Sequence, residues 1–182
     1  MNLNDLPSDP RRPSRRRFLQ TSATAAGAAT LGSLGLASGV HAAGDDIIRL
    51  GLIGCGERGT GAAIQAMNAD AGVKIVALAD VFADHVERCR GKLRQAKPDQ
   101  TAVDDDHCFA GFDAYRKVID SGVDGILIAC SSRFHPDYLT AGVEAGKHVF
   151  VEKPHAIDPP GVHRVLAACE EARKRKLSVG DK

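Results

Sequence analysis

The six residues Gly54-Cys55-Gly56-Glu57-Arg58-Gly59 have the types and the spacing of a loop that binds phosphate groups. Glycines at this spacing allow a tight turn, a close approach of a ligand to the backbone, and close packing of a following helix. Free N–H groups at the start of such a helix attract phosphate. Asp80 stands 21 positions after the last glycine, where a carboxylate can accept hydrogen bonds from ribose hydroxyl groups. The pattern predicts a dinucleotide site that includes Gly54, Gly56, Glu57, Arg58, Gly59 and Asp80.

The charges in this pattern bear on which dinucleotide is bound. A carboxylate at Asp80 repels a 2′-phosphate, so NAD is favoured over NADP. Arg58 could approach a 2′-phosphate or the pyrophosphate. We interpret it as a pyrophosphate or loop residue and keep NADP as the alternative cofactor.

The surrounding sequence must supply the elements that position these residues. Apolar segments typical of buried strands cover residues 47–53, 73–79, 107–109, 125–129, 148–151 and 177–179. Segments with helical patterning lie between them, over residues 60–68, 84–95, 113–120, 136–145 and 158–176. This alternation predicts an α/β fold with a doubly wound parallel sheet of the Rossmann type.

Ligands of such sheets bind at the carboxyl ends of the strands, which directs attention to two further loops. Residues 130–135 follow the fourth predicted strand and could contact a cofactor through the backbone, through hydroxyl groups such as that of Ser131, and through His135. An isolated loop histidine is more often simply solvated. The second loop contains Glu152-Lys153-Pro154.

This second loop carries a family resemblance. Residues 144–154, with the sequence Glu-Ala-Gly-Lys-His-Val-Phe-Val-Glu-Lys-Pro, resemble the E-A-G-K-H-V-x-x-E-K-P signature of the glucose–fructose oxidoreductase, inositol dehydrogenase and MocA family. The glycine loop is similar to the opening fingerprint of that family, and the resemblance spans about residues 47–179. It implies a catalytic Lys153 beside the nicotinamide and substrate, a cis Lys153–Pro154 peptide, Glu152 at the nicotinamide side and His135 near the cofactor. The alternative for Lys153 is a solvated lysine at a strand end.

The resemblance also implies an activity. It favours an oxidoreductase that transfers a hydride between a nicotinamide cofactor and a small carbohydrate-like substrate, namely a sugar, cyclitol or related polyol. The alternatives are an NAD-dependent glycosidase of the same superfamily and a non-catalytic NAD-binding module. Family members of this type continue into a second α/β domain that forms the substrate pocket. We expect that domain to be absent, which would make the chain a C-terminally truncated member and leaves its independent activity open.

Residues 1–42 have the pattern of an export signal. Ser14-Arg15-Arg16-Arg17-Phe18-Leu19-Gln20 resembles the twin-arginine motif, residues 21–40 carry no charge, and Val40-His41-Ala42 suits cleavage after Ala42. The uncharged run is rich in Ala, Gly, Ser and Thr but poor in Leu, so we expect no stable membrane anchor. The pattern predicts export by the twin-arginine route to the periplasm or cell envelope, with residues 43–182 forming the dinucleotide-binding domain.

The charge balance and the cysteine spacing argue against several other classes of function. Five arginines and two aspartates fall within residues 1–42, which leaves 19 basic and 21 acidic residues in 43–182. This balance leaves no basic face, so we expect no nucleic-acid partner. The five cysteines are odd in number and contain no C-x-x-C pair, which argues against a disulfide framework and a metal site. A homo-oligomer is left open.

Overall fold

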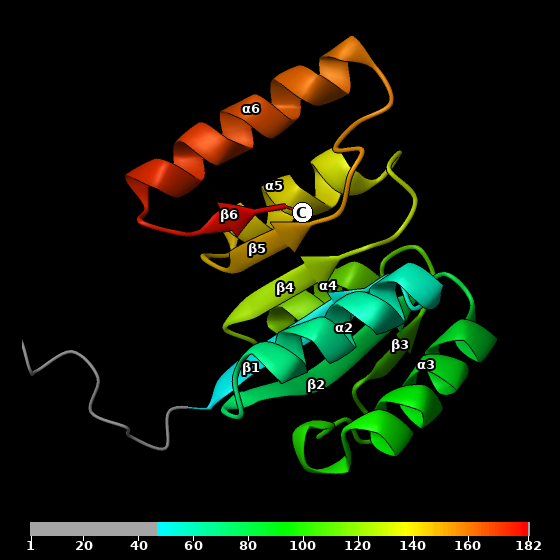
Figure 1. Cartoon of the computed structure of the whole chain (residues 1–182). Coiled ribbons are helices and arrows are strands. Elements are labelled where there is room, and N and C mark those ends of the chain that lie inside the picture. Colours follow the sequence, from blue (N-terminus) through cyan, green and yellow to red (C-terminus); the bar gives the residue numbers. More distant parts are fainter. Residues whose placement is uncertain (1–46, 182) are drawn as a thin grey trace, which may run out of the picture. The chain divides into compact units, whose positions relative to one another are not determined.

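Strands and helices alternate throughout residues 47–181, which are the residues that the computed structural model describes (Figure 1). The strands are β1 (Ile48–Ile53), β2 (Val73–Asp80), β3 (Cys108–Ala110), β4 (Gly125–Ile128), β5 (His148–Val151) and β6 (Val179–Gly180). The helices are α2 (Glu57–Ala69), α3 (Ala83–Ala96), α4 (Ala114–Asp120), α5 (His135–Glu144) and α6 (Pro159–Lys174), with a short 3₁₀ turn η1 at Pro98–Gln100. The predicted export signal lies outside the described residues.

All six strands belong to one parallel sheet with the order β3-β2-β1-β4-β5-β6. The chain first winds from β1 outward to β3 and then returns to place β4 beside β1. Two neighbouring crossovers therefore leave in opposite directions at β1 and β4, which creates a crevice at their carboxyl ends. The predicted doubly wound sheet is confirmed.

The sheet is buried on both faces. On one face the strands pack against α2 and α3 around residues such as Leu52, Ile75 and Leu93. On the other face they pack against α4, α5 and α6 around residues such as Ile128 and Leu139. Because both faces are covered, the strands consist of nearly continuous apolar residues, which is why the sequence identifies them well.

The pairing of β1 with β2 contains one irregularity. Leu50 pairs with Ile75 but Gly51 pairs with Ala77, so Val76 is an extra residue on β2. A bulge of this kind switches which side chains face each layer. Ile75 and Leu78 consequently pack under α2 and α3, while Ala77 lies in the opposite layer.

The helix boundaries follow local capping chemistry. Asp158 caps α6 by accepting a hydrogen bond from the N–H of Gly161 at 2.7 Å, and Pro159 suits the first helical position. α2 begins at Glu57, three residues before the predicted start, because the glycine loop leads directly into the helix. β6 contains only Val179 and Gly180 and is shorter than predicted. Among the described residues, no helix is long and apolar enough to cross a membrane.

Candidate dinucleotide site

The three glycines of the loop after β1 have different structural roles. Gly54 has a positive φ of 100°, and a Cβ there would lie 2.4 Å from the backbone nitrogen of Cys130 on the neighbouring strand end. A Cβ on Gly59 would lie 1.8 Å from the carbonyl oxygen of Gly54. A Cβ on Gly56 would meet no protein atom within 4 Å. Gly54 and Gly59 are thus required by the packing of the protein itself, whereas Gly56 leaves open space above the loop.

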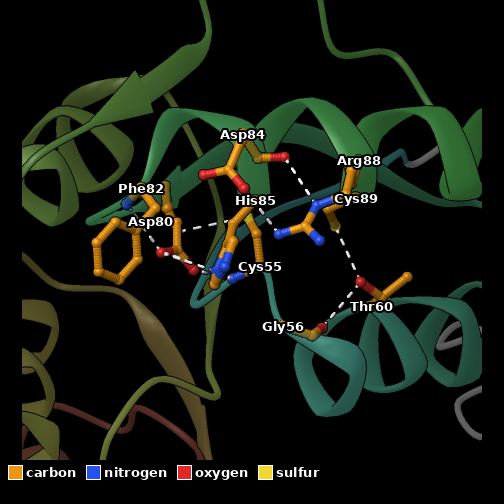
Figure 2. Close-up of polar contacts among 10 residues, drawn as sticks. Cys55, Gly56, Thr60, Asp80, Phe82, Asp84, His85, Arg88 and Cys89 are labelled. Atoms are coloured by element: carbon orange, nitrogen blue, oxygen red, sulfur yellow. Dashed lines mark hydrogen bonds and ion pairs between the residues drawn. The ribbon is translucent and has the colours of Figure 1, made fainter.

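Asp80 is held against this loop by main-chain donors (Figure 2). Its Oδ2 accepts a hydrogen bond from the N–H of Cys55 at 2.7 Å, and its Oδ1 accepts one from the N–H of Phe82 at 3.0 Å. The Nδ1 of His85 lies 3.4 Å from the same Oδ1. The Asp80 side chain is 12% exposed. These contacts orient the Asp80 carboxylate. Each of its oxygens can accept a second hydrogen bond, so Asp80 can still accept hydrogen bonds from a ligand.

A cavity of about 430 Å³ opens beside Asp80 at the carboxyl ends of the strands. Phe82, Phe112 and Phe134 line it from the loops after β2, β3 and β4. Phe82 and Phe112 are 58% and 64% exposed, and the ring centroids of Phe112 and Phe134 lie 6.1 Å apart. Exposed aromatic rings around an apolar cavity suit a planar ring such as adenine.

The same cavity brings together several of the predicted site residues. Gly54, Gly56, Asp80 and Ser131 all line it. Ser131 is exposed in the loop that follows β4. The aromatic residues were missed at the sequence level, although each stands within six residues after a strand, where a ligand contact is expected in this fold.

Arg58 and Glu152 form an ion pair between two distant parts of the site. Arg58 lies in the first turn of α2 and Glu152 follows β5, and the guanidinium Nη2 contacts the Oε1 of the carboxylate. The Glu152 side chain is only 6% exposed, while that of Arg58 is 47% exposed. The pair ties the glycine loop to the Glu152-Lys153-Pro154 segment.

Glu57, the other non-glycine residue of the predicted loop site, takes no part in this ion pair. It is exposed and pairs with Lys92 of α3. The hydrogen bond from Lys92 lowers the pKa of the Glu57 carboxyl. This contact links the start of α2 to α3.

Lys153 and Pro154 follow Glu152 beyond the end of β5. The Lys153–Pro154 peptide is cis, as the sequence resemblance predicted. Lys153 is exposed and forms no hydrogen bond or ion pair with another residue in 47–181. Its ammonium group is therefore available to a ligand at this edge of the sheet.

His135 lies in the interior and connects two loops. It is 1% exposed, its Nδ1 lies 3.0 Å from the carbonyl oxygen of Pro154, and its Nε2 lies 3.0 Å from that of Cys130. Burial lowers the pKa of His135, and the two carbonyl contacts oppose this shift in part. In this structure His135 does not line the cavity; it fixes the loop after β4 to the cis-proline segment.

No group of three or more histidine, cysteine, aspartate or glutamate side chains within residues 47–181 is arranged to hold a metal ion. All five cysteines in this part of the chain are free.

A parallel sheet of this order, with a glycine loop at the crevice and an acid at the end of the second strand, defines a dinucleotide-binding Rossmann domain. Residues 48–181 match the model of the oxidoreductase family with an NAD-binding Rossmann fold. The chain belongs to this family, which is the glucose–fructose oxidoreductase, inositol dehydrogenase and MocA family that the sequence resembles.

Known relatives cover this domain and extend well beyond it. The chain is 32% identical over 133 residues to inositol 2-dehydrogenase of Paracoccus denitrificans, covering 73% of this chain and 36% of that protein. It is 30% identical over 136 residues to glycosyl hydrolase family 109 protein 1 of Bacteroides thetaiotaomicron, covering 74% and 28%. The crystal structure of an NAD binding oxidoreductase from Klebsiella pneumoniae superposes with a TM-score of 0.58 and 25% identity, covering 75% and 34%. The chain thus spans about a third of the length of these relatives.

Proposed function

We propose that this domain binds NAD across the crevice between β1 and β4. The observation that carries the proposal is the Asp80 carboxylate, which the N–H of Cys55 holds against the glycine loop while Gly56 leaves the space above the loop free. In this arrangement the pyrophosphate lies over Gly56 at the start of α2, and Asp80 accepts hydrogen bonds from the adenosine ribose. The adenine ring lies among Phe82, Phe112 and Phe134.

The preference for NAD over NADP follows from the same carboxylate. A 2′-phosphate would approach the negative charge of Asp80, and repulsion at that distance is poorly screened because the side chain is 12% exposed. His85 is the one basic side chain in contact with Asp80 among the described residues. Arg58 pairs with Glu152, which supports a role in the loop over one at a 2′-phosphate.

We further propose that the domain serves an oxidoreductase acting on a sugar, cyclitol or related polyol. Bound nicotinamide supplies the hydride acceptor or donor in such a reaction. Lys153 binds the substrate oxygen through its exposed ammonium group and stabilises the charge that develops there. Glu152, held by Arg58, and His135, held by two carbonyl groups, keep the Lys153-Pro154 segment in place.

An NAD-dependent glycosidase is the second candidate, and one comparison is compatible with it without favouring it over the dehydrogenase. Glycosyl hydrolase family 109 protein 1 of Bacteroides thetaiotaomicron reaches nearly the same identity as inositol 2-dehydrogenase of Paracoccus denitrificans. The two activities differ in net redox change. NADH that accumulates with a free cyclitol supports the dehydrogenase, whereas cleavage of an aryl glycoside without net NADH supports the glycosidase.

Cofactor binding is tested by calorimetric titration of the purified chain with NAD and with NADP. We expect saturable binding with NAD preferred. Asp80→Asn removes the negative charge of the carboxylate that accepts hydrogen bonds from the ribose hydroxyl groups. The variant should bind NAD about 10- to 100-fold more weakly, which is the effect of losing a hydrogen bond to a charged group. Asp84→Asn is the matched control because Asp84 is 71% exposed and pairs with Arg88. If a chain that is folded by circular dichroism binds neither dinucleotide, the proposal is wrong.

The role of Lys153 requires a separate variant. Lys153→Ala should abolish most of any NADH production while leaving the NAD dissociation constant within about threefold, because the side chain does not line the cavity beside Asp80. Equal turnover of the variant and the original chain would contradict a catalytic Lys153.

We also propose export by the twin-arginine route, which rests on the pattern of residues 14–20. Replacing Arg15 and Arg16 by lysine in the full chain should block the appearance of a processed product in the periplasm. N-terminal sequencing of the processed chain should begin at Ala43. Processing that is unaffected by the double replacement would refute this route.

A further inference from the structure

His85 lies beside the proposed ribose site, and Figure 2 shows its imidazole next to the Asp80 carboxylate. It stands in the first turn of α3, its Nδ1 lies 3.4 Å from the Oδ1 of Asp80, and its side chain is 36% exposed. The ring centroids of Phe82 and His85 are 5.2 Å apart. His85 also lines the cavity of about 430 Å³ in which we place the adenosine. A group attached to the ribose at Asp80 therefore meets this imidazole.

A second cavity, of about 220 Å³, adjoins His85 and has a basic lining. His85, Arg88 and Lys92 all line it, and because they are three and four positions apart they lie on one face of α3. Gly56 of the glycine loop lines both this cavity and the larger one. Asp80, which is bonded to the glycine loop, and the basic face of α3 thus border the same loop.

Two of the three basic groups are already paired with acids. Lys92 pairs with Glu57. Arg88 donates from Nη2 to the Oδ2 of Asp84 at 2.9 Å and from Nε to the carbonyl oxygen of Asp84 at 3.2 Å. The Nη1 of Arg88 forms no hydrogen bond within residues 47–181, so it can donate to a ligand. His85 is the third basic group of this face.

Acidification changes the charge beside Asp80 through His85. Histidine is the side-chain type that ordinarily changes charge between about pH 5 and 8, whereas carboxyl, ammonium and guanidinium groups ordinarily stay charged over this range. The other titratable or charged groups around His85 come from the end of β2, the glycine loop, α2, α3 and the wall of the larger cavity: Asp80, Cys55, Glu57, Asp84, Arg88, Cys89, Lys92, Tyr115, Cys130 and Tyr138.

We infer that His85 is a specificity-determining residue of the proposed dinucleotide site: in its protonated form it offsets the charge of Asp80 and, together with Arg88, admits the 2′-phosphate of NADP. The preference for NAD then weakens as the pH falls. The inference rests on the proposed function, because it requires that a dinucleotide bind with its adenosine ribose at Asp80.

The repulsion between Asp80 and a 2′-phosphate depends on the charge of His85. When the imidazole is neutral, the carboxylate and the phosphate face each other as like charges. When the imidazole is protonated, the Asp80–His85 pair carries no net charge, and the Nη1 of Arg88 can donate to the phosphate. The Asp80 side chain is 12% exposed, so water and salt screen these charges only weakly. Removing one repulsive interaction in such surroundings should strengthen NADP binding about 10-fold.

Binding of NAD should respond much less to acid. The Oδ1 of Asp80 accepts the N–H of Phe82 at 3.0 Å, and a protonated His85 takes its second acceptor position. The Oδ2 accepts the N–H of Cys55 and keeps one position for a ribose hydroxyl group. The NAD dissociation constant should therefore change by less than about threefold between pH 7.5 and pH 5.5.

The inference is tested by calorimetric titration of the purified full chain with NAD and with NADP at pH 7.5, 6.5 and 5.5 and constant ionic strength. Circular dichroism at each pH shows whether the chain is folded. The measured quantity is the ratio of the NADP to the NAD dissociation constant, and we expect it to fall at least about 10-fold from pH 7.5 to pH 5.5. Phosphate monoesters take up a proton near about pH 6, which lowers the ratio in every variant, so the decisive comparison is between chains.

Three variants isolate the contribution of His85. His85→Gln removes the titrating charge, so its ratio at pH 5.5 should be about 10-fold above that of the original chain. His85→Lys carries a fixed positive charge, so its ratio at pH 7.5 should be about 10-fold below that of the original chain. His163→Gln is the matched control because His163 is exposed on α6 and lines neither cavity; its ratio should follow the original chain at every pH.

Arg88→Gln tests the second basic group. It should weaken NADP binding at pH 5.5 by about threefold or more and leave NAD binding unchanged, because only the 2′-phosphate reaches the guanidinium. Equal NADP binding by this variant and the original chain would overturn the part assigned to Arg88.

The inference for His85 is overturned if the ratio is the same at pH 7.5 and pH 5.5, or if it falls equally in the original chain and in His85→Gln. It is also overturned if His85→Lys keeps the ratio of the original chain at pH 7.5. If one of these two variants does not fold, the other decides. A folded chain that binds neither dinucleotide at any pH refutes the proposed function and this inference with it, whereas NAD binding with an unchanged ratio refutes this inference alone.

Discussion

The ion pair between Arg58 and Glu152 predicts a measurable effect on stability. Removing one partner of a fully buried ion pair costs about 3–5 kcal/mol, whereas exposed pairs contribute about 0–1 kcal/mol. Here the carboxylate is 6% exposed and the guanidinium 47% exposed. Arg58→Ala leaves a buried carboxylate that water reaches in part, so we expect a loss of about 2 kcal/mol in the free energy of unfolding.

Urea denaturation followed by circular dichroism measures this loss, and a double-mutant cycle isolates the pair. Glu152→Gln removes the charge, so Arg58→Ala should cost at least about 1 kcal/mol less in that background. Arg88→Ala is the matched control because Arg88 and Asp84 are both largely exposed, and it should cost under about 1 kcal/mol. A loss for Arg58→Ala no larger than for Arg88→Ala, or additive effects in the cycle, would refute the reasoning.

Three further perturbations separate folding from binding. Gly59→Ala places a Cβ 1.8 Å from the carbonyl oxygen of Gly54, so urea denaturation should show a loss of about 3 kcal/mol. In Gly56→Ala the added Cβ has no protein atom within 4 Å, so the free energy of unfolding should change by under about 0.5 kcal/mol. Calorimetry of the same variant should show NAD binding that is at least about 10-fold weaker. Burial lowers the pKa of His135 in the folded state, so the unfolded state binds more protons below about pH 6.5. The free energy of unfolding should therefore decrease as the pH falls below about 6.5, by at most about 1.4 kcal/mol per pH unit. His135→Gln should make the free energy of unfolding depend less steeply on pH in this range.

Much of the fold could be predicted because its strands are buried on both faces. Segments such as residues 125–128 and 148–151 are short and apolar, and the intervening segments show helical patterning. The alternation, together with right-handed crossovers, predicted a parallel doubly wound sheet, whereas the strand order β3-β2-β1-β4-β5-β6 is established only by the structure. The bulge at Val76 could not be predicted, since it depends on how β1 and β2 pair in three dimensions.

The candidate site was only partly visible in the sequence. The glycine loop and Asp80 were identified from the G-x-G-x-x-G spacing and from the distance along the chain to the acidic residue. This distance is nearly constant because the loop and the acid contact the pyrophosphate and the ribose of the same dinucleotide. The pairing of Arg58 with Glu152 joins residues 94 positions apart, and no local pattern encodes it. The burial of His135 likewise depends on the carbonyl oxygens of Cys130 and Pro154, which converge only when β4 and β5 lie side by side.

The different roles of the three glycines determine what the fingerprint can establish. Gly54 and Gly59 are required by contacts with the protein's own backbone, so a folded chain needs them whether or not a cofactor binds. Gly56 has no such contact, and a side chain there would occupy only the space above the loop. Contacts within the protein therefore do not exclude a side chain at this position, and a ligand that needs the space is a hypothesis that the Gly56→Ala titration tests. Together with the orientation of Asp80 by the N–H of Cys55, this makes position 56 the residue at which cofactor binding can be tested without disturbing the fold.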